Sequence, residues 1–311
     1  MIRVGMALYP EFQLINLAMA TAFEYANQSF GRPQFHLTLM SADGGPVRTS
    51  AGIEVSTVPF DDARFDTLLV VGDNDATVGP PALLGFLRAS AGRTRRIGGP
   101  CSGAFNLAGA GLLDGRRATT HWFHALKMRH EHPAVKLLDD KIFVHDDGVW
   151  TSAGATACID LALAFIEDDV GPEIAKLTAK KLVVSHRRLG GQSQHSALLE
   201  MAPRTSRIHK ALAYAKANLA QELSVEALSR VVHLSPRQFS RAFSEETGMT
   251  PAKAVERLRL EAARLMVESS SVPIDAIAKD TGFGDPDRMR RAFVRVYAQS
   301  PQALRRGYRR A

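Results

Sequence analysis

Hydrophobic positions in the first part of the chain alternate between short apolar runs and longer amphipathic stretches. Runs with the length and branched composition of strands occupy residues 3–9, 35–41, 67–71 and 95–99. The helical patterns that separate them occupy residues 12–30, 81–91 and 104–112. Alternation of strands with helices predicts βα units and a mostly parallel sheet, so we expect an α/β domain here.

The second part of the chain contains one short helical pattern twice, offset by 50 positions. The copies are Ser235–Phe243 and Asp285–Phe293, and in both the first residue carries a side-chain oxygen and the second is proline. An oxygen acceptor can cap a helix, and proline fits the first helical position because its missing N–H needs no partner there. Each copy is therefore predicted to be a helix with a defined start.

In each repeated helix the apolar residues fall on one face at a period of about 3.6 residues, which leaves the opposite face exposed. A shorter amphipathic stretch and a tight turn precede each copy. Helix, turn and basic second helix form the helix-turn-helix pattern, whose second helix enters the major groove of DNA. The side chains that we expect to contact DNA are Arg237, Gln238, Ser240, Arg241 and Ser244 in the first copy and Asp287, Arg288, Arg290 and Arg291 in the second.

A single helix is predicted between the two copies, over residues 252–268. Its apolar side chains, expected on one side, are Leu258, Ala262, Leu265 and Met266. A helix of this length spans about 25 Å and could hold two recognition helices about 34 Å apart, one turn of DNA. We therefore expect an all-α domain that presents both recognition helices to one face of a duplex.

These two units resemble the DNA-binding domain of the AraC/XylS family of bacterial transcription regulators. The residues that carry the resemblance are "LSVEALSRVVHLSPRQFSRAFSEETGMTP" and "IDAIAKDTGFGDPDRMRRAFVRVYAQSP", joined by "RLRLEAARLMVE". The resemblance implies sequence-specific binding to double-stranded DNA. The second copy has Asp287 and Met289 where the family more often has a small hydroxylic residue and an aromatic one, so the base preference of that half-site does not carry over.

Charge divides the chain at the same place as the patterns. Residues 204–311 hold 20 Lys and Arg against 11 Asp and Glu, whereas residues 1–203 hold 19 against 21. Positive charge concentrated in one part of a chain is typical of a nucleic-acid-binding domain, because it attracts phosphate. With 311 residues the chain exceeds what one core usually supports, so we expect domains at 1–188 and 207–311, joined by a glycine-bearing linker at 189–206.

The chain has only two cysteines and no apolar run that approaches the roughly 18 residues of a membrane span. Its N-terminus lacks the basic and apolar regions of a signal peptide. Four histidines lie close together in sequence without the spacing of a zinc motif: His121, His124, His130 and His132. We therefore expect a cytoplasmic protein without a membrane partner, a metal site or a cofactor.

Cys101 lies at a strand-to-helix corner in the segment Arg96–Ala104. Small residues on both sides of it allow a sharp turn of the kind that holds the nucleophile of many hydrolases. We expect its sulfur to be exposed above the start of the following helix, where the partial positive charge of the helix lowers a thiol pKa. A buried, inert cysteine at the same corner is the alternative interpretation.

The first domain resembles the ThiJ/PfpI domain of the glutamine amidotransferase-like superfamily. The resemblance is carried by "LLVVGD", "GPCSGAFNLAGAGLLDGRRATTHW" and "RRLGGQSQ". Such a domain followed by AraC-type units is the architecture of the GlxA family of regulators. The resemblance implies a flavodoxin-like α/β sandwich with a small-molecule site at the elbow, formed by Asn16, Gly72, Cys101, Ser102 and His121.

The same resemblance bears on catalysis. Enzymes of this superfamily pair the elbow cysteine with a nearby acidic residue or histidine, and this chain has Asn16 and Ser102 at those places. Because an amide cannot move a proton at neutral pH, we expect no catalytic residues and no enzyme. Two alternatives stay open: a hydrolase or hydratase of small amides, isonitriles or aldehydes, and a redox sensor based on Cys101, for which Cys158 in an apolar helix is an unfit resolving partner.

These features predict a transcription regulator that binds operator DNA through its second domain and senses a small metabolite through its first. Resemblance to GlxA-type regulators implies an amino-acid or amine metabolite as the effector. We expect a homodimer, and RNA polymerase is a further expected partner if the protein activates transcription.

Overall fold

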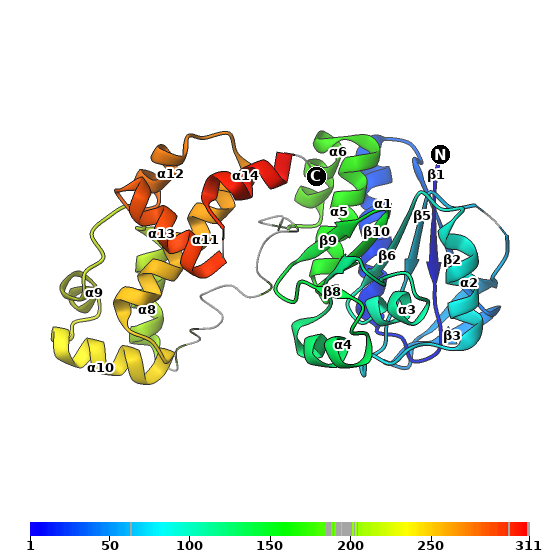
Figure 1. The fold of residues 1–311 in the computed structure, drawn as a ribbon, viewed down its shortest axis with the longest axis horizontal. Helices are drawn as coiled ribbons and strands as arrows, with labels where there is room; N and C mark the ends of the chain where they lie inside the picture. The colour runs from blue at the N-terminus through cyan, green and yellow to red at the C-terminus, as the bar shows by residue number, and fades with distance from the viewer. Residues whose placement is uncertain are drawn as a thin grey trace. The chain divides into compact units, whose positions relative to one another are not determined.

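The computed structural model describes residues 1–62, 64–184, 188, 190, 194, 201, 203, 205–297 and 299–309. The chain divides into two compact units, Met1–Gln194 and His195–Ala311, and each is described by itself (Figure 1). The division lies inside the stretch 189–206 where the linker is expected.

The first unit is built on a sheet that contains, in the described residues, eight strands in the order β3-β4-β2-β1-β5-β6-β10-β9. These strands are β1 (Ile2–Ala7), β2 (Phe35–Ser41), β3 (Asp43–Arg48), β4 (Glu54–Pro59), β5 (Thr67–Val70), β6 (Arg96–Pro100), β9 (Phe143–Asp146) and β10 (Val149–Ser152). Neighbouring strands pair in parallel from β4 to β10, whereas β3 and β9 pair antiparallel at the two edges. The prediction of a mostly parallel α/β sheet is confirmed.

Helices cover both faces of this sheet (Figure 1). One face carries α1 (Ala18–Phe30), α5 (Ala157–Val170) and α6 (Pro172–Lys181), and the other carries α2 (Pro81–Ala91) and α3 (Gly103–Gly109). The chain passes from β1 through α1 to β2 in one direction and from β5 through α2 to β6 in the other, so its direction reverses between β1 and β5. In open α/β sheets ligands bind beside such a reversal, at the carboxyl ends of the strands.

Shorter elements complete the first unit. They are the 3-10 helices η1 (Leu14–Leu17) and η2 (Trp122–His124), helix α4 (Ala125–Glu131) and the paired strands β7 (Arg117–Ala118) and β8 (Lys136–Leu137). The helix predicted from residue 12 begins later, because Phe12 forms isolated bridges with Thr49 and Asp73 and a 3-10 turn follows it. The sequence around Phe12 is apolar and runs directly into the helix, so it contains no local signal for bridges with residues far along the chain.

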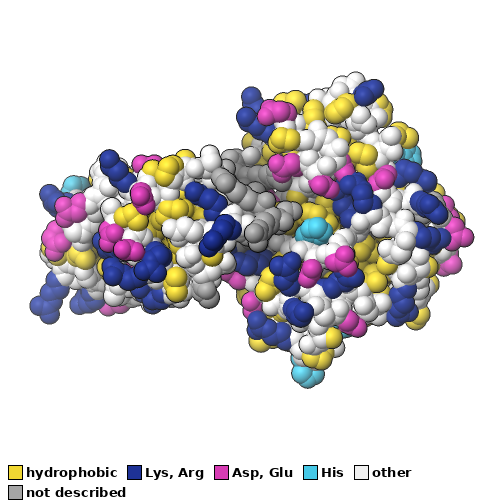
Figure 2. Space-filling model, turned by 45° about the horizontal axis from the view of Figure 1, so that its top comes forward, with side chains coloured by type: hydrophobic (Ala, Val, Ile, Leu, Met, Phe, Trp, Pro, Cys, Tyr) yellow, Lys and Arg dark blue, Asp and Glu magenta, His cyan; other side chains and the backbone are white. Residues whose placement is uncertain are grey.

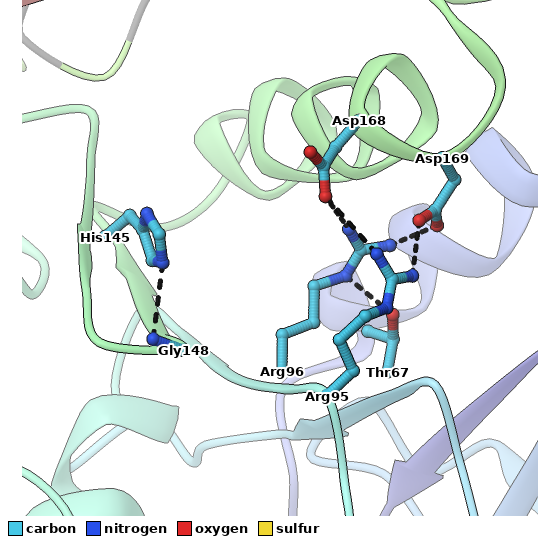
Figure 3. A network of polar contacts seen from close by, with 7 residues as sticks. All are labelled: Thr67, Arg95, Arg96, His145, Gly148, Asp168 and Asp169. Carbon is cyan, nitrogen blue, oxygen red and sulfur yellow. Dashed lines mark hydrogen bonds and ion pairs between the residues drawn. The ribbon is translucent and has the colours of Figure 1, made fainter. Parts of the chain in front are cut away.

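A buried ion-pair network ties β6 to the end of α5 (Figure 3). The guanidinium of Arg96 is 3% exposed; it donates to Thr67 Oγ1 at 2.7 Å and to Asp168 Oδ2 at 2.8 Å, and it also pairs with Asp169. Arg95 reaches the same two carboxylates from the surface. Burial lowers the pKa of Arg96, and its two carboxylate partners oppose that effect. The network fixes the strand that leads into the Cys101 corner.

The second unit is all-α, as expected. Its helices are α8 (Ser206–Ala217), α9 (Val225–Val231), α10 (Pro236–Thr247), α11 (Pro251–Ser269), α12 (Ile274–Asp280), α13 (Pro286–Tyr297) and α14 (Pro301–Arg309). It has two apolar cores, one containing Phe239 and Phe243 and the other containing Met289 and Phe293. The single-sided burial predicted for the central helix is wrong, because α11 sends side chains such as Leu258 and Leu260 into the two cores separately.

Candidate DNA interface and elbow site

The first recognition helix, α10, begins at a capping box. Ser235 Oγ accepts from the backbone N–H of Gln238, and Gln238 Oε1 accepts from the backbone N–H of Ser235 at 3.1 Å. Pro236 occupies the first helical position, as predicted. At the other end Gly248 takes a left-handed conformation with φ of 70° and ends the helix. Local sequence therefore defines both ends of α10.

The exposed face of α10 carries most of the side chains predicted to contact DNA. Arg237, Gln238 and Arg241 are exposed, and Ser240 and Ser244 are half-buried. Arg241 lies 3.5 Å from Glu245, with both side chains mainly in solvent, so this ion pair is weak and DNA phosphate can displace it. Gln238 uses its carbonyl oxygen in the capping box, which leaves its amide N–H₂ as the group available to a base.

The second recognition helix, α13, begins in a similar way. Asp285 Oδ1 accepts from the backbone N–H of Asp287 at 2.9 Å. The four side chains predicted to contact DNA are exposed: Asp287, Arg288, Arg290 and Arg291. Asp287 and Arg290 form an ion pair at 3.2 Å, so the negative charge of Asp287, which by itself would repel phosphate, is partly compensated within the helix.

Arg259 of α11 adds positive charge that the helical repeat did not predict. Its guanidinium donates to Leu219 O at 3.1 Å and to Gln221 O at 2.8 Å, which holds the half-buried side chain against Gly282 in the turn before α13. Burial lowers the pKa of Arg259, and the charge of Arg288 lowers it further. On the face shown in Figure 2, Lys and Arg side chains are distributed over the helical unit, several of them in contact with one another.

In the first unit, Cys101 occupies the sharp corner between β6 and α3, with φ of 55°. This conformation is uncommon for a residue with a side chain and is often found at functional corners. Gly72, at the end of β5, is in close contact with the corner, since a Cβ there would lie 2.2 Å from Ser102 Oγ. Ser102 Oγ donates to Asp73 O at 2.5 Å. The corner therefore lies at the carboxyl ends of β5 and β6, beside the reversal of the sheet.

The expectation of an exposed, activated sulfur at this corner is wrong. Cys101 is 3% exposed, and burial raises the pKa of its thiol. Backbone N–H groups of Ser102 and Ala155 lie close enough to offset part of this effect. A thiolate at this depth would lose its hydration, which favours the neutral thiol.

Asn16 supports the site through its amide group. It is 1% exposed, and its Nδ2 donates to Gln13 O at 3.0 Å and to Gly72 O at 3.3 Å. Each of these carbonyls also accepts a backbone N–H, so the amide is a second donor to both, whereas a carboxylate at this position would repel them. Asn16 therefore ties η1 to the end of β5, beside the Cys101 corner.

His121 lies next to Cys101 across Gly154. The Thr120 hydroxyl donates to Cys101 O at 3.0 Å, which brings this segment to the corner. A Cβ on Gly154 would lie 2.5 Å from Cys101 Sγ and 3.1 Å from His121 Cδ2, so the two side chains meet at the same point. His121 Nδ1 accepts from the backbone N–H of Phe123 at 3.2 Å. All five predicted elbow residues are thus brought together, and Thr120 and Gly154 join them without a signal in the sequence.

Cys158, the second cysteine, belongs to the same neighbourhood. It lies on α5, its Sγ is 3.6 Å from Ile15 O, and burial together with the nearby Cys101 raises its pKa to about 12. Both thiols therefore stay protonated at neutral pH. In the part of the chain that the structure describes, no group of three or more His, Cys, Asp or Glu side chains is placed to hold a metal ion, and no helix is long and apolar enough to cross a membrane.

Comparison with known proteins agrees with this architecture. The DJ-1/PfpI family matches residues 15–168, and a helix-turn-helix domain matches residues 228–307. The HTH-type transcriptional regulator GlxA of Rhizobium meliloti (strain 1021) is 31% identical over 321 residues, 98% of this chain and 95% of that protein. Isonitrile hydratase of Pseudomonas putida is 32% identical over 188 residues, 58% of this chain and 78% of the enzyme. The crystal structure of an AraC family transcriptional regulator from Pseudomonas putida matches with a TM-score of 0.53 and 23% identity, over 58% of this chain and 100% of that one.

The fold and the two exposed recognition helices define a transcription regulator in which a flavodoxin-like α/β domain precedes two DNA-binding helix-turn-helix units. The chain belongs to the family of GlxA-like HTH-type transcriptional regulators, which join a DJ-1/PfpI domain to an AraC-type DNA-binding domain. The family, the fold class and double-stranded DNA as a partner are confirmed.

Proposed function

We propose that the elbow site, formed by Asn16, Gly72, Cys101, Ser102 and His121, binds a small polar effector that controls how the helix-turn-helix units bind operator DNA. The observation that supports this most is the convergence of separate segments at the carboxyl ends of β5 and β6, beside the reversal of the sheet. Backbone N–H groups of Ser102 and Ala155 beside the sulfur suit a carboxylate or carbonyl oxygen. An amino acid, or an amine metabolite that carries a carboxylate, fits that chemistry.

A thermal-shift screen of the purified protein against small metabolites tests this proposal. A ligand present at about 100 times its Kd stabilises the folded protein by about 2.7 kcal/mol, which raises the melting temperature measurably. Cys101→Ser keeps the size of the side chain, so we expect it to weaken binding by less than about tenfold. The screen would contradict the proposal if every stabilising compound bound the Cys101→Ser and Gly154→Ala variants as tightly as the wild type.

We further propose that the elbow site performs no turnover. Asn16 uses its amide to hold backbone carbonyls, His121 accepts a backbone N–H, and the Cys101 thiol is protonated at neutral pH. An activated thiolate next to a proton-accepting side chain would be needed for nucleophilic catalysis. These three groups therefore favour a binding site.

The second candidate function is that of a hydratase with Cys101 as its nucleophile, and the 32% identity to isonitrile hydratase supports it. The two functions are separated by measuring product formation from panels of isonitriles, amides and glyoxals with the wild type and with Cys101→Ser. Turnover that disappears in the variant would replace effector binding as the function of this site.

Two partner proposals accompany the regulator. We propose a homodimer, because two copies would double the number of recognition helices on a DNA site. Light scattering of the purified protein at several concentrations measures this directly. RNA polymerase is a proposed partner if reporter transcription rises when the protein is expressed.

A further inference from the structure

We propose that Gln194 is a latch between the elbow site and the chain that leads to the DNA-binding unit, so that opening the site releases this chain. The inference rests on the proposed effector function and names the route by which occupancy of the site reaches the DNA-binding unit.

Two segments lie against the Cys101 corner. The first contains Thr120 and His121, and Thr120 is hydrogen-bonded to Cys101 O. The second contains Gly154 and Ala155, whose backbone lies against the sulfur. Because Cys101 is only 3% exposed, a molecule reaches its sulfur only when residues around the corner move, and in the proposed opening the segment with His121 moves.

Gln194 holds the first segment on both sides of His121. Its Nε2 donates to Thr120 O at 2.8 Å and to Asp139 O at 2.9 Å, and its Oε1 accepts from the backbone N–H of Trp122 at 2.9 Å. An amide N–H₂ has two hydrogens, so these two short contacts use both, and the longer contacts to Thr119 and Lys141 are secondary. Moving His121 outward therefore breaks the hydrogen bonds of Gln194.

Arg188 is bonded to residues that directly follow the second segment. Its guanidinium donates to Thr156 Oγ1 and to Asp160 Oδ2, at 2.8 Å and 2.9 Å. Its backbone N–H donates to Asp160 Oδ1 at 2.8 Å. Gln194 thus holds the first segment and Arg188 the start of the helix after the second, and both residues lie near the end of the first unit.

The chain after Gln194 is anchored directly in the DNA-binding unit. Met201 is 1% exposed within the apolar core that contains Phe239. Thr205 donates from its backbone N–H and its hydroxyl to the carboxylate of Glu246 on α10, at 2.9 Å each. The interval from Gln194 to Met201 can span about 24 Å at most. If the hydrogen bonds of Gln194 break, the last anchored residue is Gly190, whose carbonyl accepts from the backbone N–H of Phe143 at 3.3 Å, and the interval can then span about 38 Å. Release of Gln194 would therefore lengthen the tether of the first recognition helix.

Reciprocal chemical and proteolytic probes of the full-length protein, without DNA or effector, test the latch. Iodoacetamide probes opening of the site: the sulfur of Cys101 bonds to the acetamide carbon, iodide leaves, and the thiol proton passes to solvent. Peptide mass spectrometry separates Cys101 from Cys158. Cleavage after Glu200 by a glutamyl endopeptidase probes release of the chain. The variants are Gln194→Ala and the isosteric Gln194→Glu, which loses both donor hydrogens, with Gln28→Ala on the exposed face of α1 as the matched control.

We expect both Gln194 variants to accelerate Cys101 alkylation and Glu200 cleavage by about tenfold each, as the loss of two or three hydrogen bonds allows. Alkylated wild type should also be cleaved faster, whereas alkylation should add little in the Gln194 variants or in Cys101→Ser. Gln28→Ala should leave both rates unchanged. Rates within twofold of wild type in a folded Gln194 variant, or faster cleavage with unchanged alkylation, would overturn the latch. Neither result would contradict DNA binding or effector binding, which the DNA titrations and the thermal-shift screen test separately.

Discussion

Gly154 lies directly against Cys101. A Cβ on Gly154 would be 2.5 Å from the Cys101 sulfur and 2.9 Å from its Cβ, and the φ of 121° at Gly154 is one that other residues rarely adopt. The sequence position is therefore restricted to glycine by the elbow site itself, although it lies far along the chain from Cys101.

Gly154→Ala should consequently damage the effector site. We expect effector affinity to fall by at least about tenfold, because the added methyl group must displace the sulfur or the segment over it. DNA affinity without effector should stay within about twofold. Gly92→Ala, where nothing lies within 4 Å of the added Cβ, is the matched control and should behave as wild type in both titrations. Equal effector affinity of the two variants would remove Gly154 and Cys101 from the site.

The reactivity of Cys101 should follow its raised pKa. Burial favours the neutral thiol, so the thiolate fraction is small at neutral pH and increases as the pH approaches the raised pKa. We expect alkylation of Cys101 to keep accelerating with pH beyond about 8.5, where an ordinary thiol begins to level off. The rate is measured by mass spectrometry at each pH. A plateau near neutral pH would mean that the helix start lowers the pKa after all.

Arg96→Ala should destabilise the first unit. Removing this guanidinium leaves Asp169, whose side chain is 2% exposed, with only the half-exposed Arg95 as its partner; breaking a buried pair typically costs about 3 to 5 kcal/mol, and because Arg95 stays in place we expect the lower end of that range. Arg93→Ala is the control, because its partner Asp62 is 97% exposed and a surface pair contributes less than about 1 kcal/mol. Both tryptophans, Trp122 and Trp150, lie in this unit, so urea unfolding followed by their fluorescence reports on it. Equal midpoints for the two variants would contradict the assignment.

The two recognition helices should differ in how they bind DNA. Arg237→Ala on α10 should cost about 1 to 3 kcal/mol for operator DNA and little for random DNA, as expected for a residue that reads a base. Arg291→Ala on α13 should weaken both kinds of DNA and reduce the slope of log K against log salt by about one unit. Arg295→Ala is the control on the same helix, since Glu256 compensates its charge at 2.7 Å. A base-specific loss from Arg291→Ala with an unchanged slope would reverse the roles of the two helices.

Local signals predicted the parts of the structure that depend on local geometry. The starts of α10 and α13 could be found because a capping oxygen, a proline and a period of about 3.6 residues act within one or two turns. The two-sided burial of α11 was missed, since a pattern reports which residues are apolar but not how many cores share them.

The sequence indicated which residues lie at the Cys101 corner, but it did not indicate that the sulfur is buried. Cys101 and Asn16 were identified by the corner sequence and by resemblance, whereas burial of the sulfur depends on Gly154 and Thr120, which come from other segments. Gln194 lies in a polar, glycine-bearing stretch that is typical of a linker. Its hydrogen bonds could not be predicted, because the carbonyls that its amide contacts come from segments far away in the sequence.

The central claim, that the first unit controls DNA binding by the second through effector occupancy, is tested most directly by one titration. An operator selected from a randomised DNA pool is titrated with full-length protein at fixed salt, with and without the effector found by thermal shift. We predict sequence-specific binding whose Kd changes at least about fivefold with effector, the lower end of typical coupling between sites. The Arg237→Ala, Arg241→Ala double variant should lose operator binding in both conditions. An operator Kd that is the same with and without a bound effector would contradict the account.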